Sequence, residues 1–265
     1  MTAFKNQVVW ITGASSGIGE ALAYACAKEG SKLVLSARRT SALERVKAAC
    51  QLPGDQILVV PLDLAEHDAM QTKVEQVMQH FGRIDHLINN AGISQRSLLK
   101  DTEFAVFKKL IDVDYLGTVA LTKAVLPIFM EQQRGHFSVV TSLMGKFASP
   151  LRAGYCGAKH ALHGFFDALR MEHHEDQIKV TLICPGFIQT NVSMNALTGD
   201  GSPQQTMDQA TGKGIPVDRC AQKIIRGIKA NRHEVIVARR EKIGVYLKRF
   251  FPRLLHEFVR KSEVT

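Results

Sequence analysis

The 265-residue chain carries 34 Lys and Arg residues against 25 Asp and Glu, a formal net charge of +9 at pH 7. Its composition, 45% hydrophobic and 22% charged with 20 Gly and 8 Pro, excludes a disordered, collagen-like or low-complexity chain. No run approaches the roughly 18 uninterrupted apolar residues of a membrane-spanning helix, and the first residues lack an apolar signal segment. We therefore expect a soluble, cytoplasmic protein.

The positive charge is concentrated near the C-terminus. Residues 231–265 hold nine Lys or Arg and four Glu, which accounts for more than half of the excess. A basic stripe along the main domain is therefore absent, and nucleic acid is not an expected partner. The five cysteines are an odd number without a C-x-x-C pair, so they are interpreted as reduced thiols and no metal site is expected.

Seven short β-branched runs alternate with amphipathic segments of helical length. This alternation predicts βαβ units and a parallel sheet covered on both faces. The irregular, glycine-containing stretch 191–214 follows the sixth run, at the edge where open α/β sheets bind ligands. The predicted strands are Gln7–Thr12, Lys32–Ser36, Gln56–Leu62, Ile84–Asn89, Gly135–Thr141, Ile178–Ile183 and His233–Ala238.

A glycine-rich turn separates the first strand from the first helix. Gly13, Gly17 and Gly19 have the spacing G-x-x-x-G-x-G, and Glu20 follows where a P-loop would have Lys and Ser or Thr. Glycines let a backbone approach a pyrophosphate, whose charge a helix N-terminus stabilises. The turn therefore predicts a dinucleotide site rather than nucleotide triphosphate hydrolysis.

With this spacing, the sequence resembles the short-chain dehydrogenase/reductase family. The stretches Tyr115–Lys123 and Cys184–Ser202 resemble the branch that includes dehydrogenase/reductase family member 7B. Further elements of the family pattern occur in order across about 240 residues. These elements are Asn89-Asn90-Ala91-Gly92, Ser142, Tyr155-Cys156-Gly157-Ala158-Lys159 and Pro185-Gly186-Phe187-Ile188-Gln189-Thr190.

The resemblance implies a single Rossmann-like domain, a seven-stranded parallel sheet and a nicotinamide dinucleotide cofactor. The expected division is an NADP-binding domain over 1–238, including substrate loop 191–214, and a basic amphipathic extension over 239–265. The residues expected to bind the cofactor are Gly13, Ser15, Ser16, Gly17, Ile18, Gly19, Arg38, Asp63, Asn90, Ala91, Gly92, Tyr155, Lys159, Pro185, Gly186, Ile188 and Thr190.

The end of the second strand favours NADP(H). An acid there would bind the ribose 2′-hydroxyl of NAD, but Ala37 occupies the position and Arg38 follows, with Ser15 as a second candidate contact. The alternative is that Arg38 and Arg39 are a solvated start to the next helix. Asp63 matches the family position that contacts adenine, and its alternative role is to cap the following helix.

Tyr155 and Lys159 are four residues apart and share one helix face. A phenol has an ordinary pKa near 10, and an adjacent ammonium stabilises its anion, so Tyr155 is the candidate proton donor and acceptor. By family resemblance, Lys159 also binds the nicotinamide ribose. Ser142 would hydrogen-bond the oxygen of a carbonyl or alcohol substrate. We therefore expect an NADP-dependent oxidoreductase.

Asp114 departs from the pattern, because the family usually has Asn at this position. A carboxylate near Lys159 would stabilise the ammonium and oppose the tyrosinate. The hypothesis is that activity persists with a more alkaline optimum or a lower rate. The alternative is an NADP-binding protein with weak turnover that acts in redox sensing or as an interaction protein.

Two surfaces carry expectations about partners. Apolar residues beside the site suit a hydrophobic, lipid-like substrate, and they would equally suit a loop that packs on the core. The segment 239–261 has apolar residues at helical spacing with a break at Pro252. It is expected either to pack on its own or a neighbouring subunit or to attach peripherally to anionic lipid. A homodimer or homotetramer through helices resembling Thr102–Glu131 and Gly154–His174 is also expected.

Overall fold

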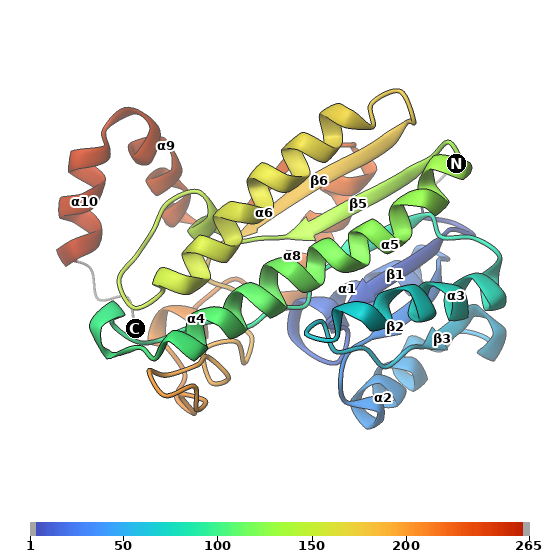
Figure 1. The fold of residues 1–265 in the computed structure, drawn as a ribbon, viewed down its shortest axis with the longest axis horizontal. Helices are drawn as coiled ribbons and strands as arrows, with labels where there is room; N and C mark the ends of the chain where they lie inside the picture. The colour runs from blue at the N-terminus through green and yellow to red at the C-terminus, as the bar shows by residue number, and fades with distance from the viewer. Residues whose placement is uncertain (1–3, 262–265) are drawn as a thin grey trace.

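The seven predicted strands all form, and they make one parallel sheet (Figure 1). The computed structural model describes residues 4–261. Residues 1–3 of the predicted domain 1–238 and residues 262–265 of the predicted extension 239–265 lie outside this range. The observed strands are β1 (Val8–Thr12), β2 (Lys32–Ser36), β3 (Ile57–Val59), β4 (His86–Asn89), β5 (Gly135–Val140), β6 (Ile178–Pro185) and β7 (Glu234–Val237).

The strand order is β3-β2-β1-β4-β5-β6-β7, so the direction of chain progression reverses between β1 and β4. At this switch Ile11 of β1 pairs with Leu35 of β2 on one side and Ile88 of β4 on the other. Ligands of open parallel sheets bind in the crevice outside the strand carboxyl ends at such a reversal. The fold class expected from the sequence is confirmed.

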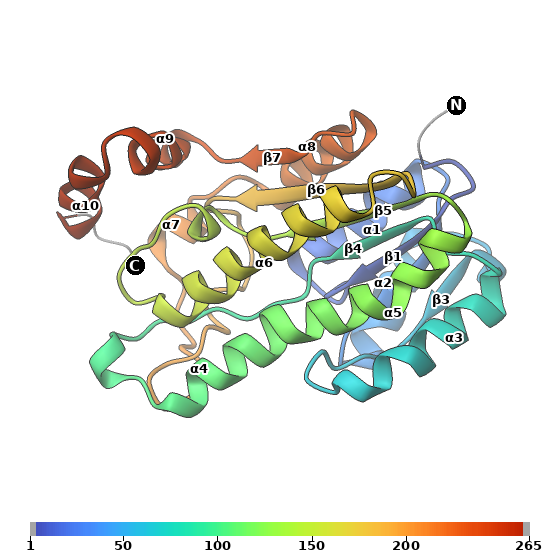
Figure 2. The ribbon, with the colours of Figure 1, turned by 45° about the horizontal axis from the view of Figure 1, so that its top comes forward.

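Helices cover both faces of the sheet, as Figure 2 shows from a second direction. Helices α1 (Gly17–Lys28), α2 (Thr40–Cys50) and α8 (Val217–Lys229) pack on one face, while α3 (Met70–Phe81), α5 (Gly117–Glu131) and α6 (Ala153–Glu172) pack on the other. The remaining helices are α4 (Phe104–Ile111), α7 (Gln209–Gly212), α9 (Ile243–Phe250) and α10 (Pro252–Lys261). Short 3-10 turns are η1 (Gly54–Gln56), η2 (His67–Ala69), η3 (Leu99–Asp101), η5 (Leu143–Gly145) and η6 (Arg240–Lys242).

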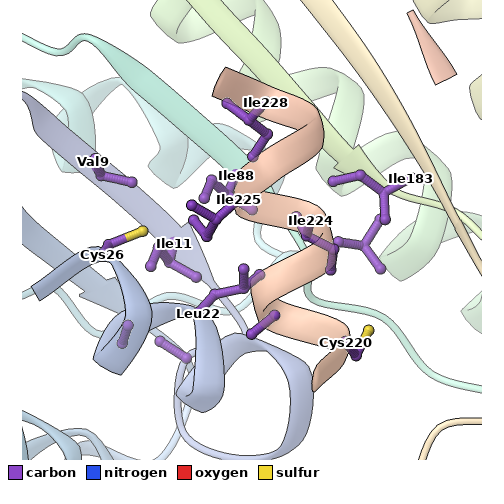
Figure 3. Packing of buried hydrophobic residues seen from close by; sticks show 14 of the residues in the cluster. Val9, Ile11, Leu22, Cys26, Ile88, Ile183, Cys220, Ile224, Ile225 and Ile228 are labelled. Carbon is purple, nitrogen blue, oxygen red and sulfur yellow. The ribbon is translucent and has the colours of Figure 1, made fainter. Parts of the chain in front are cut away.

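The core beneath α8 shows how these layers hold together (Figure 3). Ile224 and Ile225 of α8 lie against Leu22 of α1 and against Ile11 and Ile88 of the two central strands, and all five side chains are buried. Full burial of each such side chain stabilises the fold by about 1.5–3 kcal/mol. The carboxyl end of β1 is thereby held between its neighbours.

One continuous helical segment, Phe104–Glu131, is long and apolar enough to cross a membrane by length and composition. It comprises α4, a π-helical turn over Asp112–Leu116 and α5. Leu121, Val125 and Phe129 are fully buried in the core beneath α5. Packing inside the domain therefore accounts for the apolar character of this segment.

Candidate active site

The glycine-rich turn after β1 brings two strand ends into contact. Gly13 and Gly17 have φ values of +65° and +58°, a backbone region that favours glycine. A Cβ atom on Gly13 or Gly19 would come within 2.8 or 2.5 Å of the Asn90 side-chain nitrogen. These glycines are thus required for close approach to the end of β4 as well as for the shape of the turn.

Thr12 and Asn90 lock this approach. The Asn90 side-chain amide donates to the Thr12 carbonyl at 2.9 Å, and the backbone N–H groups of Asn90 and Ala91 each donate to the Thr12 hydroxyl at 3.0 Å. The predicted residues Asn90 and Ala91 therefore lie directly beside the glycine turn. Thr12 belongs to the same network but was missed as a site residue; its position immediately before Gly13 is the available sequence signal.

A pocket of about 430 Å³ opens beside this turn. Four of its lining residues were predicted to bind the cofactor: Ser15, Ser16, Gly17 and Thr190. Arg38 is exposed directly after β2 and is not among the lining residues. The lining residues that the sequence did not single out for this site are Glu20, Arg39, Ala42, Arg45, Gln189, Asn191 and Val217.

Arg45 closes one side of the pocket. Its guanidinium donates to both carboxylate oxygens of Glu20 at 2.7 and 2.8 Å and to the Ser15 carbonyl at 3.2 Å. The hydrogen bond from Arg45 lowers the pKa of Glu20, although partial burial opposes the shift. This ion pair joins α2 to the start of α1 and leaves Arg39 as a further cation on the pocket wall.

These residues fit a dinucleotide phosphate. The turn has no room for a side chain at Gly13 or Gly19, and no side chain caps the first turn of α1 in the described range 4–261. Ile18, the predicted residue inside the turn, packs partly buried against the core. Asp63 instead makes a local turn contact, accepting from the Ala65 N–H at 3.0 Å; the next helical turn begins at His67, so this contact does not cap it.

The segment after β6 also lines this pocket. Pro185 ends the strand and Gly186 follows it. Ile188 is buried and bridges to Ile215, while a Cβ on Gly17 would meet the Thr190 side chain at 3.2 Å. Of the predicted residues in this segment, Thr190 therefore faces the glycine turn across the pocket.

Ser142, Tyr155 and Lys159 come from neighbouring elements. Ser142 directly follows β5, and its hydroxyl accepts from the Met144 N–H at 3.0 Å. Tyr155 and Lys159 lie one turn apart on α6, with the lysine Nζ 5.6 Å from the centre of the tyrosine ring. The start of α6 is fixed by the fully buried Gln95, whose side-chain oxygen accepts from the Gly154 N–H at 2.9 Å.

Asp114 and Lys159 form a buried ion pair. The lysine Nζ lies 3.4 Å from one carboxylate oxygen of Asp114, and the other oxygen accepts from the Ile93 N–H at 2.7 Å. Both side chains are at least 96% buried. A Cβ on Gly92 would lie 3.1 Å from the lysine Nζ and 3.2 Å from the carboxylate. A side chain at residue 92 would therefore contact both charged groups.

Burial and charge act in opposite directions on this pair. Burial alone would lower the pKa of Lys159, but the charges of Asp114 and Tyr155 outweigh it, so the pKa of Lys159 is raised. Burial raises the pKa of Asp114, although Lys159 and the Ile93 N–H oppose that shift. Lys159 thus stays an ammonium ion, and this ion interacts with both Asp114 and Tyr155.

The substrate loop is held by a second buried cluster that the sequence did not predict. Arg96 donates twice to one carboxylate oxygen of Asp208, at 2.9 and 2.6 Å, and Arg152 lies 3.4 Å from the same oxygen. Burial raises the pKa of Asp208, but the hydrogen bonds and charges of its neighbours outweigh burial and the pKa is lowered. Burial lowers the pKa of Arg152 to about 10, against the charge of Asp208.

The apolar residues of loop 191–214 divide between two environments. Leu197 is buried with Tyr155 packed against its cluster, and its backbone exchanges hydrogen bonds with Ser94 and Arg96, each at 2.8 Å. Val192 and Met194 are exposed. Packing on the core therefore accounts for Leu197, and the interpretation that this loop binds a hydrophobic substrate stays a prediction.

Removing the carboxylate at 208 is expected to loosen the loop. Asp208→Asn leaves two buried guanidinium groups without their counter-ion, and loss of one partner of a buried pair destabilises by about 3–5 kcal/mol. Amide hydrogen exchange of residues 193–208 should accelerate at least tenfold. Asp218→Asn, which changes an exposed carboxylate at the start of α8, is the matched control and should leave exchange of this loop unchanged. Equal acceleration in both variants would contradict a clamping role for Asp208.

Comparison with known proteins agrees with this geometry. The sequence model of the short chain dehydrogenase family matches residues 7–200. The chain is similar to human dehydrogenase/reductase SDR family member 7, at 44% identity over 93% of this chain and 75% of that protein. It is also similar to bovine dehydrogenase/reductase SDR family member 7B, at 40% identity over 94% of this chain and 79% of that protein.

Among solved structures, a short chain dehydrogenase/reductase from Burkholderia phymatum in complex with NAD has the same fold. It superposes with a TM-score of 0.85 at 22% identity and covers 96% of both chains. The match to the family sequence model, the identity to the two mammalian proteins and the shared fold lead to one conclusion: this chain belongs to the short-chain dehydrogenase/reductase family of oxidoreductases.

Proposed function

We propose that this protein is an NADP(H)-dependent oxidoreductase that moves a hydride between nicotinamide and a carbonyl or secondary alcohol. The observation that carries the proposal is the placement of Ser142, Tyr155 and Lys159 on adjacent elements at the carboxyl edge of the sheet. A bound nicotinamide supplies or accepts the hydride. The residues of the chain then have to hold the substrate oxygen and move one proton.

Tyr155 is the residue proposed to move that proton. Its hydroxyl protonates the substrate oxygen when a carbonyl is reduced and takes the proton back when an alcohol is oxidised. The Lys159 ammonium, 5.6 Å from the ring, stabilises the phenolate left behind. Ser142 holds the substrate oxygen near the phenol. Such positioning lowers the activation barrier, because less entropy is lost in bringing the reacting groups together.

The cation arrangement supports NADP(H). Ala37 and Arg38 replace the acid that would bind an unphosphorylated ribose, and Arg39 and Arg45 add cations on the pocket wall. The Burkholderia protein was solved with NAD, but its 22% identity supports likeness of fold alone. The cofactor preference of this chain therefore rests on its own residues.

The proposed substrate is a hydrophobic, lipid-like carbonyl or alcohol, supported by the exposed Val192 and Met194 in the substrate loop. A homodimer or homotetramer is proposed through α4, α5 and α6, where Phe104 and Met171 are exposed apolar side chains. A cytoplasmic location is supported by the cysteines, all five of which are free thiols.

A second candidate function is favoured by the Asp114–Lys159 ion pair. If the carboxylate withdraws too much of the ammonium's charge from Tyr155, the protein would bind NADP(H) with weak turnover and act in redox sensing or through interactions. The rates of the variants below separate this role from the catalytic one.

Replacing the tyrosine tests the catalytic role. Tyr155→Phe removes the proton donor while leaving the ring that packs near Leu197. Carbonyl reduction with NADPH should fall by about 10²–10⁴-fold, the usual contribution of general acid–base catalysis. Calorimetric binding of NADPH should stay within threefold of the parent protein. Tyr246→Phe, which loses an exposed hydroxyl on α9 outside the proposed proton path, is the control. Retained activity in Tyr155→Phe would contradict the assignment of Tyr155 as the proton donor and acceptor.

Cofactor preference is tested at Arg38 by binding rather than turnover. Hydrogen bonds to charged groups contribute about 1.5–3 kcal/mol, so Arg38→Ala should weaken NADPH binding by about 10–100-fold. NADH binding should change less than threefold, because NADH has no 2′-phosphate. Lys28→Ala, which removes one cation at the far end of α1, should change neither. Equal calorimetric affinity of the parent protein for NADPH and NADH would refute the preference.

The pH dependence tests Asp114. Asp114→Asn keeps the side-chain shape and the acceptor for the Ile93 N–H, but it removes the charge that competes for Lys159. The ammonium then stabilises the tyrosinate more strongly, and the acidic limb of the pH–rate profile for alcohol oxidation should move to lower pH. Asp112→Asn, on the same π-helical turn, is the control. An unchanged profile in Asp114→Asn would show that the carboxylate does not oppose the base.

A further inference from the structure

Helices α9 and α10 display a contiguous set of exposed, large apolar side chains. Ile243, Tyr246 and Phe250 follow one face of α9 at helical spacing, and Phe251 and Leu254 continue the set into α10. Each of these five side chains is between 53% and 68% exposed. Single exposed apolar residues are ordinary, but a contiguous apolar surface of this kind marks an interaction site. We call these five residues the apolar face.

The apolar face is not needed to attach the two helices to the domain. Other residues do so: Leu255 is 2% exposed and joins a cluster with Leu143 and Phe147. Gly244 lies so close to the ring of Phe147 that a Cβ there would be 2.8 Å from it. The interpretation that this segment packs on its own subunit is therefore correct for one side of the helices, and the apolar face lies on the other.

Cations border the apolar face. Within residues 239–260 the exposed basic residues are Arg239, Arg240, Lys242, Lys248, Arg249, Arg253 and Arg260, and the two acids are Glu241 and Glu257. Glu257 is paired with Arg260 at 2.8 Å, and Glu241 reaches the Phe187 N–H at 3.4 Å. The acids thus do not neutralise the border around Lys248, Arg249 and Arg253.

This combination selects one kind of partner. Apolar side chains bordered by cations complement the acyl boundary and charged headgroups of an anionic bilayer. A twofold interface places the same surface of both copies together, so the cations that border the apolar face of one copy would approach the cations that border the face of the other. Like charges in that position oppose a dimer through this face.

The apolar face lies at the functional end of the molecule. In Figures 1 and 2, α9 and α10 project beyond the carboxyl ends of the strands, at the end where α4 and α7 lie. The cluster that anchors them contains Leu143, the residue after Ser142. A surface that held the apolar face would therefore also meet the end of the protein where the site opens.

We propose that α9 and α10 dock on an anionic lipid bilayer. Ile243, Tyr246, Phe250, Phe251 and Leu254 enter the boundary between headgroups and acyl chains, and the bordering Lys and Arg side chains bind the headgroups. This attachment is peripheral, and it does not depend on which cofactor or substrate the site takes.

Vesicle sedimentation of the full chain tests the proposal. The protein should sediment with vesicles containing phosphatidylserine and phosphatidylcholine, sediment far less with phosphatidylcholine alone, and be released by added salt. The double variant Phe250→Ser/Leu254→Ser should lose at least tenfold in vesicle affinity, because two apolar side chains no longer enter the bilayer. Leu99→Ser, an equally exposed position on η3, should bind as the parent does.

Charge reversal gives an independent measurement. Arg249→Glu/Arg253→Glu should weaken vesicle binding by at least about 25-fold, from about fivefold per cation removed. Lys28→Glu/Lys100→Glu, outside the segment, should leave vesicle binding within threefold of the parent. NADPH binding of all variants, measured in solution, reports that each is folded and keeps this test separate from the proposed oxidoreductase activity.

Three outcomes would overturn the proposal. The first is no sedimentation of the parent chain with anionic vesicles. The second is an equal loss of vesicle binding in the control variants. The third is a dimer that dissociates in Phe250→Ser/Leu254→Ser, seen by light scattering, while vesicles bind neither protein; the apolar face would then be an interface with a second copy.

Discussion

Seven parallel strands end at the same edge of the sheet, because each crossover returns the chain to the opposite edge before the next strand begins. The glycine turn after β1, Asn90 after β4, Ser142 after β5 and Gly186 after β6 all follow from that constraint. Residues up to 173 positions apart in the chain thus meet in one region. The Thr12–Asn90 hydrogen bonds fix the two central strand ends on which this region is built.

Two buried clusters of charged side chains have different roles at this edge of the sheet. Asp114 and Lys159 place charged groups next to the phenol of Tyr155. At both groups the effect of burial on the pKa is opposed by the neighbouring charge. Arg96, Arg152 and Asp208 carry charge too, but their contacts join the substrate loop to the start of α6. A single displaced group in the second cluster would move the loop, whereas one in the first would change the proton chemistry.

Local patterns in the sequence predicted most of this fold. Alternation of β-branched runs with helical segments located all seven strands within a few residues, since periodicity and turn chemistry are local properties. The glycine spacing and the four-residue step from Tyr155 to Lys159 placed the proposed site for the same reason. The departure at Asp114 was visible as a residue type, and the structure then showed the ion pair that it makes.

Contacts between distant residues could not be predicted this way. Arg45 and Glu20 are 25 residues apart, and Arg96 and Asp208 are 112 apart, so no spacing rule joins either pair. The apolar pattern of residues 243–258 indicated helices with a break at Pro252. Only packing against Phe147 decides which side is covered, and that depends on where the sheet places η5.

Gly92 sets a limit on how this site can diverge. A side chain there would meet the ammonium of Lys159 and the carboxylate of Asp114 from almost equal distances. A lineage that replaced Asp114 by a smaller residue would relieve only one of the two collisions, because the lysine would still occupy its space. The lysine and the aspartate therefore each favour a glycine at residue 92. A side chain at residue 92 would therefore still be crowded by the lysine whichever residue stood at position 114.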